Sequence, residues 1–389
     1  MLALVTRSIL PLAFAVIFLM AAAPEVTASQ PVPKVKRVFI LNSFNQGYIW
    51  TDRMLRGIDD TLAKSGLNLE TSTSYMDMKR IKPNETYFYK LKEMLKEGYR
   101  DIRFDILIAC DNDALDFLRK YRDELFPGVP LVFSSINDFD EKMLDGRKDL
   151  TGTSENTDYL GTINLALKLR PDTNNIIVVS DETTTGRAHV SAINKIRQKV
   201  DKKVDFTFLS LGNHTLDELA AKLAALPETS IVLLVQHFKD KNGNSFSVQQ
   251  STPVLAERSS VPVFVLTDIR VGLGPIGGSV VSGYHHGEAA ATMAVEVLKG
   301  RSIATIAVLT ESPNKFIFDY NAMKRFDISE ASLPDGNIVI KRPVSNFEKY
   351  RTLFFVSLTT ILVLAALIIV MWLEQKKRRK TEYELLFHF

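Results

Sequence analysis

The sequence contains a single cysteine among its 389 residues, Cys110 in the apolar run FDILIAC. One cysteine cannot form an intrachain disulfide, so the fold must rest on its hydrophobic core. No cysteine stands near the apolar segment at the N-terminus, which excludes a lipid anchor there. We expect Cys110 to behave as a small buried apolar side chain.

The sequence also lacks a strong excess of either charge. Its formal net charge is +3, and 24% of its residues are charged. A nucleic-acid-binding protein would normally carry a dominant basic patch, so the composition argues against nucleic acid as a partner. With 46% hydrophobic residues the chain has an ordinary globular composition and can bury a sizeable core.

Residue spacings typical of a metal or catalytic centre are absent. The adjacent His285 and His286 would point to different faces of any regular element, and no His/Cys group has zinc spacing. Ser134 and Ser135 lack the G-x-S-x-G turn of a nucleophile elbow. We therefore predict no metal, no cofactor and no catalytic residue. A hydrolase using cleft carboxylates remains an alternative that no spacing supports.

Two motifs match functional patterns only in part. GLGPIG, from Gly272, fits G-x-G-x-x-G, but Pro275 interrupts it and a strand-like GSVVSG comes next, where a dinucleotide site needs a helix. We predict a glycine-rich crossover between lobes there. The segment from Asp240, DKNGNSFSVQQ, has its glycine at position 4 and no Glu at position 12, so a surface turn is favoured over a calcium loop.

A long apolar run lies near the C-terminus, TLFFVSLTTILVLAALIIVMWL at residues 352–373. It holds 22 residues without a charge, and about 20 suffice to span a bilayer as a helix. The cations KKRRK come next, at 376–380, and mark the cytoplasmic side by the positive-inside rule. We predict a transmembrane helix at 352–373 and a cytoplasmic stub at 374–389.

A second apolar run lies at the N-terminus, where Arg7 precedes SILPLAFAVIFLMAAA and small residues stand at 26–29. This order is typical of a secretory signal, with cleavage after Ala28, although an uncleaved first anchor is the alternative. In either case residues 1–29 direct the rest of the chain to export. The main domain is then extracytoplasmic, at an inner (cytoplasmic) membrane.

Short apolar runs alternate with helical patterns between these two segments. Runs rich in Val, Ile and Leu on both faces predict buried parallel strands, at 38, 105, 130, 175, 205, 231 and 262. Helical patterns separate them, such as Leu55, Ile58 and Leu62, or the T-x-x-E capping box of Thr215 to Glu218. This alternation predicts an α/β fold with doubly wound parallel sheets.

The exported part, residues 35–345, exceeds one comfortable core and suggests two lobes. We predict a first lobe at about 35–150, a second at about 151–283 and return segments at 284–345. In such folds ligands bind beyond the carboxyl ends of the strands. Polar residues stand after several predicted strands, with the aromatic Phe44, Tyr48 and Trp50 after the first, and could form a pocket for a small polar organic ligand. Caps and turns are the alternative role for each of them.

Three segments resemble a known family. They are LTGTSENTDYLGTINLALKLRPDTNNIIVVSDETTTG from Leu150, GPIGGSVVSGYHHGEAAATMAVEVLKG from Gly274, and FDYNAMKRFDIS from Phe318. Over residues 36–345 the chain resembles type 1 periplasmic substrate-binding proteins, in the uncharacterised and tryptophan-type branch of ABC-transporter binders. The third segment departs from the family pattern at Phe326 and Asp327, where Leu and Gly are usual.

The resemblance implies a two-lobed fold with the ligand, an amino-acid-like or other small polar metabolite, held between the lobes. Carried over by position, it implicates eleven ligand-binding residues: Asn45, Tyr48, Asp111, Ser134, Asn137, Glu155, Asp181, Thr184, Gln236, Asp268 and Tyr284.

The membrane helix after the binding domain resembles the sensor regions of bacterial signalling proteins. Such regions pass their signal to a histidine kinase or another output module. We therefore predict a membrane-anchored solute sensor. The alternative is the tethered substrate-binding component of an ABC transporter, whose partner is a permease.

Overall fold

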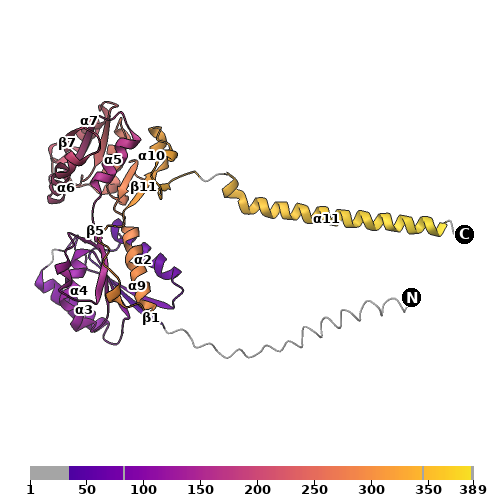
Figure 1. Cartoon of the computed structure of the whole chain (residues 1–389), viewed down its shortest axis with the longest axis horizontal. Coiled ribbons are helices and arrows are strands. Elements are labelled where there is room, and N and C mark those ends of the chain that lie inside the picture. The colour runs from indigo at the N-terminus through magenta and orange to yellow at the C-terminus, as the bar shows by residue number, and fades with distance from the viewer. Residues whose placement is uncertain (1–34, 82–83, 344–345, 387–389) are drawn as a thin grey trace.

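The computed structural model describes residues 35–81, 84–343 and 346–386. It contains two α/β lobes and a long C-terminal helix that extends away from them (Figure 1). The predicted signal segment at 1–29 and the end of the predicted stub, 387–389, lie outside the described residues.

The first lobe is built on a five-stranded parallel sheet in the order β2-β1-β3-β4-β5. Its strands are β1 (Lys36–Asn42), β2 (Leu69–Tyr75), β3 (Ile106–Cys110), β4 (Leu131–Asn137) and β5 (Leu150–Glu155). Its helices are α2 (Ile49–Lys64), α3 (Glu85–Gly98), α4 (Asp111–Leu125) and α9 (Gly283–Leu298).

Alternation along the central strand shows why this sheet is buried on both faces. Phe39 and Leu41 pack into the cluster formed with α3 and α4, whereas Val38 and Ile40 pack into the cluster formed with α2 and α9. Side chains of successive strand residues point to opposite faces, so a strand apolar at every position needs helices on both sides. Cys110 is fully buried within the second of these clusters, as predicted.

The second lobe has a seven-stranded sheet in the order β12-β11-β10-β9-β8-β6-β7. All neighbours are parallel except β10 and β11, which differs from the fully parallel sheet expected. Its strands are β6 (Asn175–Ser180), β7 (Asp205–Ser210), β8 (Ser230–Leu234), β9 (Val263–Val265), β10 (Gly277–Val280), β11 (Lys315–Asp319) and β12 (Ile338–Ile340). Its helices are α5 (Tyr159–Leu169), α6 (Thr184–Ile196), α7 (Leu216–Ala224), α8 (Val248–Arg258) and α10 (Tyr320–Arg325).

The chain passes between the lobes three times, after β5, before α9 and before β11 (Figure 1). The first passage comes later than the predicted boundary near 150, because β5 is hydrogen-bonded to β4 of the first sheet. Helix α9 packs against α2 in the first lobe, and the backbone of Leu309 is hydrogen-bonded to β5. The return segment therefore belongs to both lobes, because α9 packs in the first lobe and β11 and β12 complete the second sheet.

The glycines of GLGPIG have a packing role within the second lobe. This loop joins the short 3₁₀ turn at Asp268–Arg270 to β10, so it is not the crossover that the sequence suggested. A Cβ on Gly277 would lie 1.9 Å from the carbonyl oxygen of Ile317 on β11, and its φ is +127°. Only glycine permits this conformation at such a close backbone approach.

Two local predictions are confirmed by hydrogen bonds. The Thr215 hydroxyl accepts from the Glu218 amide at 3.2 Å, and the Glu218 carboxylate accepts from the Thr215 amide at 2.8 Å, which is a capping box at the start of α7. Asp240 accepts from the amides of Asn242 and Asn244, both at 2.9 Å. Its carboxylate closes a turn.

Helix α11 (Asn346–Leu386) contains the predicted membrane segment. From Glu348 to Lys380 it is long and apolar enough to cross a membrane, and the lobes bury none of its most apolar window. A helix that is apolar on all sides and packs against nothing normally meets lipid.

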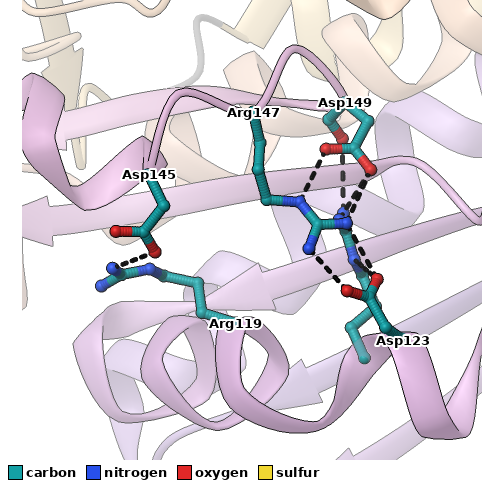
Figure 2. Close-up of polar contacts among 6 residues, drawn as sticks. Arg119, Asp123, Asp145, Arg147 and Asp149 are labelled. Carbon is teal, nitrogen blue, oxygen red and sulfur yellow. Dashed lines mark hydrogen bonds and ion pairs between the residues drawn. The ribbon is translucent and has the colours of Figure 1, made fainter.

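An ion-pair cluster joins α4 to the segment before β5 (Figure 2). Arg147 donates to both oxygens of Asp123, at 2.7 and 2.8 Å, and also to Asp149. The buried Arg122 donates to Asp149 at 2.7 Å. Bidentate pairing of this kind fixes geometry as well as charge, so the cluster holds one side of the first lobe together.

Candidate functional site

The candidate site lies where the carboxyl ends of the two sheets face each other. Arg53 of α2 in the first lobe forms a 3.1 Å ion pair with Asp268, which comes after β9 in the second. Tyr48 in the first lobe and Arg270 in the second are also within electrostatic reach of each other. The two lobes therefore present their strand ends to a common junction.

Asp111 is held at this junction in an unusual backbone conformation. It stands directly after β3, has a φ of +67° and is only 6% exposed. Its carboxylate accepts a hydrogen bond of 3.0 Å from the Trp50 indole nitrogen. Burial raises its pKa to about 7, although the Trp50 hydrogen bond and the charge of Lys79 act against the rise. A non-glycine residue with positive φ is often found at a functional site.

Glu155 stands at the end of β5 and is within electrostatic reach of Asp111. Burial and the neighbouring charge of Asp111 raise the pKa of Glu155 to about 8, and Lys79 opposes that rise. Asp111 is buried and Glu155 is half-buried, and two carboxyl groups that act on each other repel when both are ionised. This edge of the first lobe therefore favours the binding of a positive charge or a hydrogen-bond donor.

Arg270 is the main charged group on the opposite side of the junction. Its side chain is 3% exposed, and it forms no ion pair with any carboxylate among the described residues. Its Nη1 donates to the Thr267 hydroxyl at 2.5 Å, while Nε has no hydrogen-bond partner in the described chain. Burial lowers its pKa to about 10. A buried cation without a counterion is costly, so this guanidinium is suited to receive an anion.

Several buried polar atoms at the edge of the first sheet also lack partners within the described residues. They are both amide atoms of Asn42 and the hydroxyls of Thr51, Ser134 and Ser135. Buried polar groups are almost always hydrogen-bonded, so a group of exceptions at one edge needs an explanation. A polar molecule bound there would provide hydrogen-bond partners for these atoms.

Two of the predicted ligand residues in the second lobe are engaged by other protein groups. Both oxygens of Asp181 accept hydrogen bonds, one from Thr183 and the other from the Phe238 amide. Asp268 pairs with Arg53 and accepts from Ser282 at 2.8 Å. The carboxylates of Asp181 and Asp268 thus shape the second-lobe side of the junction.

Tyr284 is the predicted residue that lies apart from the carboxylates. Its hydroxyl donates to Asp60 of α2 at 2.9 Å. Its electrostatic neighbours are Asp60, Glu288 and Arg56, not Asp111 or Glu155. The structure gives Tyr284 a role in joining α9 to α2.

The other predicted residues lie at strand ends with varied surroundings. Tyr48 packs edge-on against Phe44, and Gln236 is buried after β8. The backbone of Asn137 is hydrogen-bonded to the side chain of Asn112, and the Asn45 side-chain amide donates to the Gln46 carbonyl. Thr184 begins α6, and its side chain is outside the described part of the structure.

Sequence reasoning missed four residues of this junction. Arg270 and Lys79 are cations, whereas the residues expected at the strand ends were acids, amides, hydroxyls and aromatics. Phe238 faces the Arg270 guanidinium at 6.0 Å, and His189 shares a 2.5 Å hydrogen bond with the Tyr159 hydroxyl. The signal for Arg270 was present, because only two residues separate it from the apolar run FVLT.

A cavity of about 770 Å³ lies elsewhere, at the amino ends of strands in the first lobe. Its lining includes Tyr99, Arg103 and Phe126 and none of the predicted ligand residues. Ligands of open α/β sheets bind at carboxyl ends, so the lobe junction, and not this cavity, is the candidate functional site. Among the described residues no cluster of His, Cys, Asp and Glu could hold a metal ion.

Several solved structures are similar to this chain at low sequence identity. One is the ligand-free, open form of a substrate-binding protein with adhesive properties from Clostridium difficile, which is 15% identical. The match covers 79% of this chain and 100% of that one, with a TM-score of 0.55. An ABC domain from Streptococcus pneumoniae in complex with L-Trp is also 15% identical, with the same coverage and a TM-score of 0.49.

A third similar structure is an ABC transporter solute-binding protein from Bacillus halodurans with bound myo-inositol. It is 13% identical over 78% of this chain and 100% of that one, with a TM-score of 0.44. A search of curated proteins found no match. The family model of ABC transporter substrate binding proteins matches residues 51–333, which is most of the chain. This protein therefore belongs to the ABC transporter substrate-binding protein family.

Proposed function

We propose that this protein is a membrane-anchored, extracytoplasmic solute-binding protein that senses a small polar organic ligand. The ligand, an amino-acid-like or similar metabolite, is held between the lobes, and its binding is signalled at the membrane. The observation that carries the proposal is Arg270, a buried guanidinium without a carboxylate partner among the described residues. An anionic group on the ligand would provide the missing counterion.

The location of the protein is part of the same proposal. Helix α11 would cross the inner membrane, with KKRRK at its cytoplasmic end and the two lobes on the periplasmic side. Lobe closure would act on α11 because only a few residues of the sequence separate the end of β12 at Ile340 from the start of α11 at Asn346. A ligand can shift the lobes only by its difference in affinity for the two arrangements.

The second candidate is the substrate-binding component of an ABC transporter, which family membership favours. The two functions share one binding site and differ in the partner that recognises the closed lobes. A sensor would pass its state to a histidine kinase or another output module, whereas a transport component would dock on a permease. Copurification of the native membrane protein with either partner distinguishes them.

A solute screen on the full-length chain in detergent micelles tests the binding function. Amino acids, organic acids and sugars are each added, and thermal unfolding is followed by intrinsic fluorescence. We expect saturable stabilisation by at least one anionic or zwitterionic solute, about 2.7 kcal/mol at a hundredfold excess over the dissociation constant. The Arg270→Met variant should lose at least tenfold in affinity. A folded wild-type protein that responds to none of these solutes would contradict the proposal.

A further inference from the structure

Lys79 lies over a pair of aromatic rings at the first-lobe side of the junction. Its Nζ is 4.3 Å from the ring centroid of Phe44 and 5.2 Å from that of Tyr48. The two rings meet edge to face, with centroids 5.6 Å apart. An ammonium is attracted to aromatic faces at such distances, so the two rings together form a site for a cation.

The backbone holds this lysine near the end of the first sheet. The amides of Met76 and Met78 donate to the carbonyls of Asn42 and Ser43, which ties the segment after β2 to the end of β1. Lys79 is the next residue and remains exposed to solvent. The position of its backbone is therefore fixed, while its side chain is exposed to solvent.

Lys79 is also within electrostatic reach of the buried Asp111 and the half-buried Glu155. Lys79 acts on both Asp111 and Glu155, and Tyr48 is affected by the same two carboxylates. Yet Lys79 forms no direct ion pair with a carboxylate in the described chain. The positive charge of Lys79 thus offsets the charge of the carboxylates without direct contact. Another cation in the same place would have the same effect.

We propose that Phe44, Tyr48, Asp111 and Glu155 form a subsite for an organic ammonium group, and that the ammonium of Lys79 fills it until a solute replaces it. The inference rests on the proposed function in that this subsite is one end of the solute site. Arg270 in the second lobe receives the anionic end. The preferred ligand is then a zwitterion carrying a primary ammonium, and a neutral polyol cannot displace Lys79.

Replacing Lys79 distinguishes two roles for this side chain, as a competitor of the solute or as a contact to the solute. If Lys79 competes with the solute, its removal strengthens the binding of ammonium compounds. If Lys79 instead contacts an anionic part of the solute, its removal weakens binding and creates no affinity for amines. The direction of the change therefore decides between the two roles.

The experiment uses n-propylammonium chloride as the probe, with the full-length chain in detergent micelles at constant ionic strength. Thermal unfolding is followed by intrinsic fluorescence in wild type, Lys79→Ala and Lys79→Met, the latter keeping the apolar stem. Lys90→Ala is the matched control, because Lys90 is another exposed lysine of the first lobe. Sodium propionate serves as the control for the charge of the probe.

In both Lys79 variants we expect saturable stabilisation by n-propylammonium, with a midpoint at least tenfold lower than in wild type and in Lys90→Ala. Adding Glu155→Gln to Lys79→Met should remove most of this gain, and propionate should not reproduce it. Equal midpoints in wild type and the Lys79 variants would overturn the inference. The probe is not the natural solute, so this outcome is independent of the solute screen and of Arg270.

Discussion

The ion-pair cluster of the first lobe and the junction between the lobes each contain a buried arginine, but they differ in whether that arginine pairs with a carboxylate. In the cluster, Arg122 is buried but pairs with Asp149, and Arg147 binds Asp123 and Asp149 together (Figure 2). At the junction, Arg270 is equally buried and has no carboxylate partner in the described chain. Desolvation is costly in both places, but within the described residues only the cluster offsets it with direct ion pairs, whereas Arg270 has only the more distant charge of Asp181. The difference marks the cluster as structural, and under the proposed function a ligand would complete the charge balance at the junction.

The largest expected effect comes from breaking the cluster. Arg122→Met leaves Asp149 with only part of its compensation and should lower the free energy of unfolding by about 3 kcal/mol. Urea unfolding of the full-length chain in micelles measures this. Arg119→Met is the matched control, because Arg119 pairs with the exposed Asp145, and it should cost less than about 1 kcal/mol. Equal losses in the two variants would remove the contrast between buried and exposed pairs.

A smaller effect should appear in the dependence of stability on pH. Burial raises the pKa of Glu155 to about 8. Its folded form therefore holds a proton more tightly than its unfolded form. Stability then falls as pH rises from about 4.5, the ordinary value for Glu, and levels off above about 8. Glu155→Gln should flatten this fall and be more stable than wild type at pH 9, by an amount on the order of 2 kcal/mol.

The acid limb provides the internal control for that measurement. Pairing with Arg147 lowers the pKa of Asp123 and Asp149, so their contribution is present above the ordinary Asp value and is lost as pH falls below it. Urea midpoints below pH 4 should therefore be the same function of pH in wild type and Glu155→Gln. An unchanged slope between pH 5 and 8 in the variant would show that Glu155 is not the group responsible.

The smallest expected effect is on the stability of the ligand-free Arg270→Met variant. Replacing Arg270 by an apolar side chain of similar length removes a desolvation cost but also removes the hydrogen bond to Thr267, so the free energy of unfolding should stay the same or rise by up to about 1 kcal/mol. The measurement is again urea unfolding, beside Arg122→Met. A loss as large as that of Arg122→Met would mean that Arg270 supports the fold itself.

Much of the fold could be predicted because its signals are local. Strands apolar at every position, such as Val38 to Leu41, demand a sheet covered on both faces, and the capping box at Thr215 marks the start of a helix. The boundary between the lobes was harder to predict from the sequence. Whether β5 joins the first sheet depends on pairing with β4, and the path of α9 depends on its packing against α2.

The candidate site could be predicted only in part. Asp111 was expected from its position after a strand and Glu155 from the family resemblance, and both stand at the carboxyl ends of first-lobe strands. Arg270 and Lys79 were missed, because a charged side chain after a strand looks the same in sequence whether it is solvated or buried. Tyr284 was also expected there, but the hydroxyl of this residue is hydrogen-bonded to Asp60.

The sequence alone determined the α/β class, the long apolar segment at 352–373 and the reliance on a core rather than disulfides, because hydrophobic pattern and composition are properties of the chain. Only the tertiary structure decided which charges are compensated. Arg122 and Arg270 have the same chemistry, and what separates them is whether folding brings a carboxylate within reach of the guanidinium.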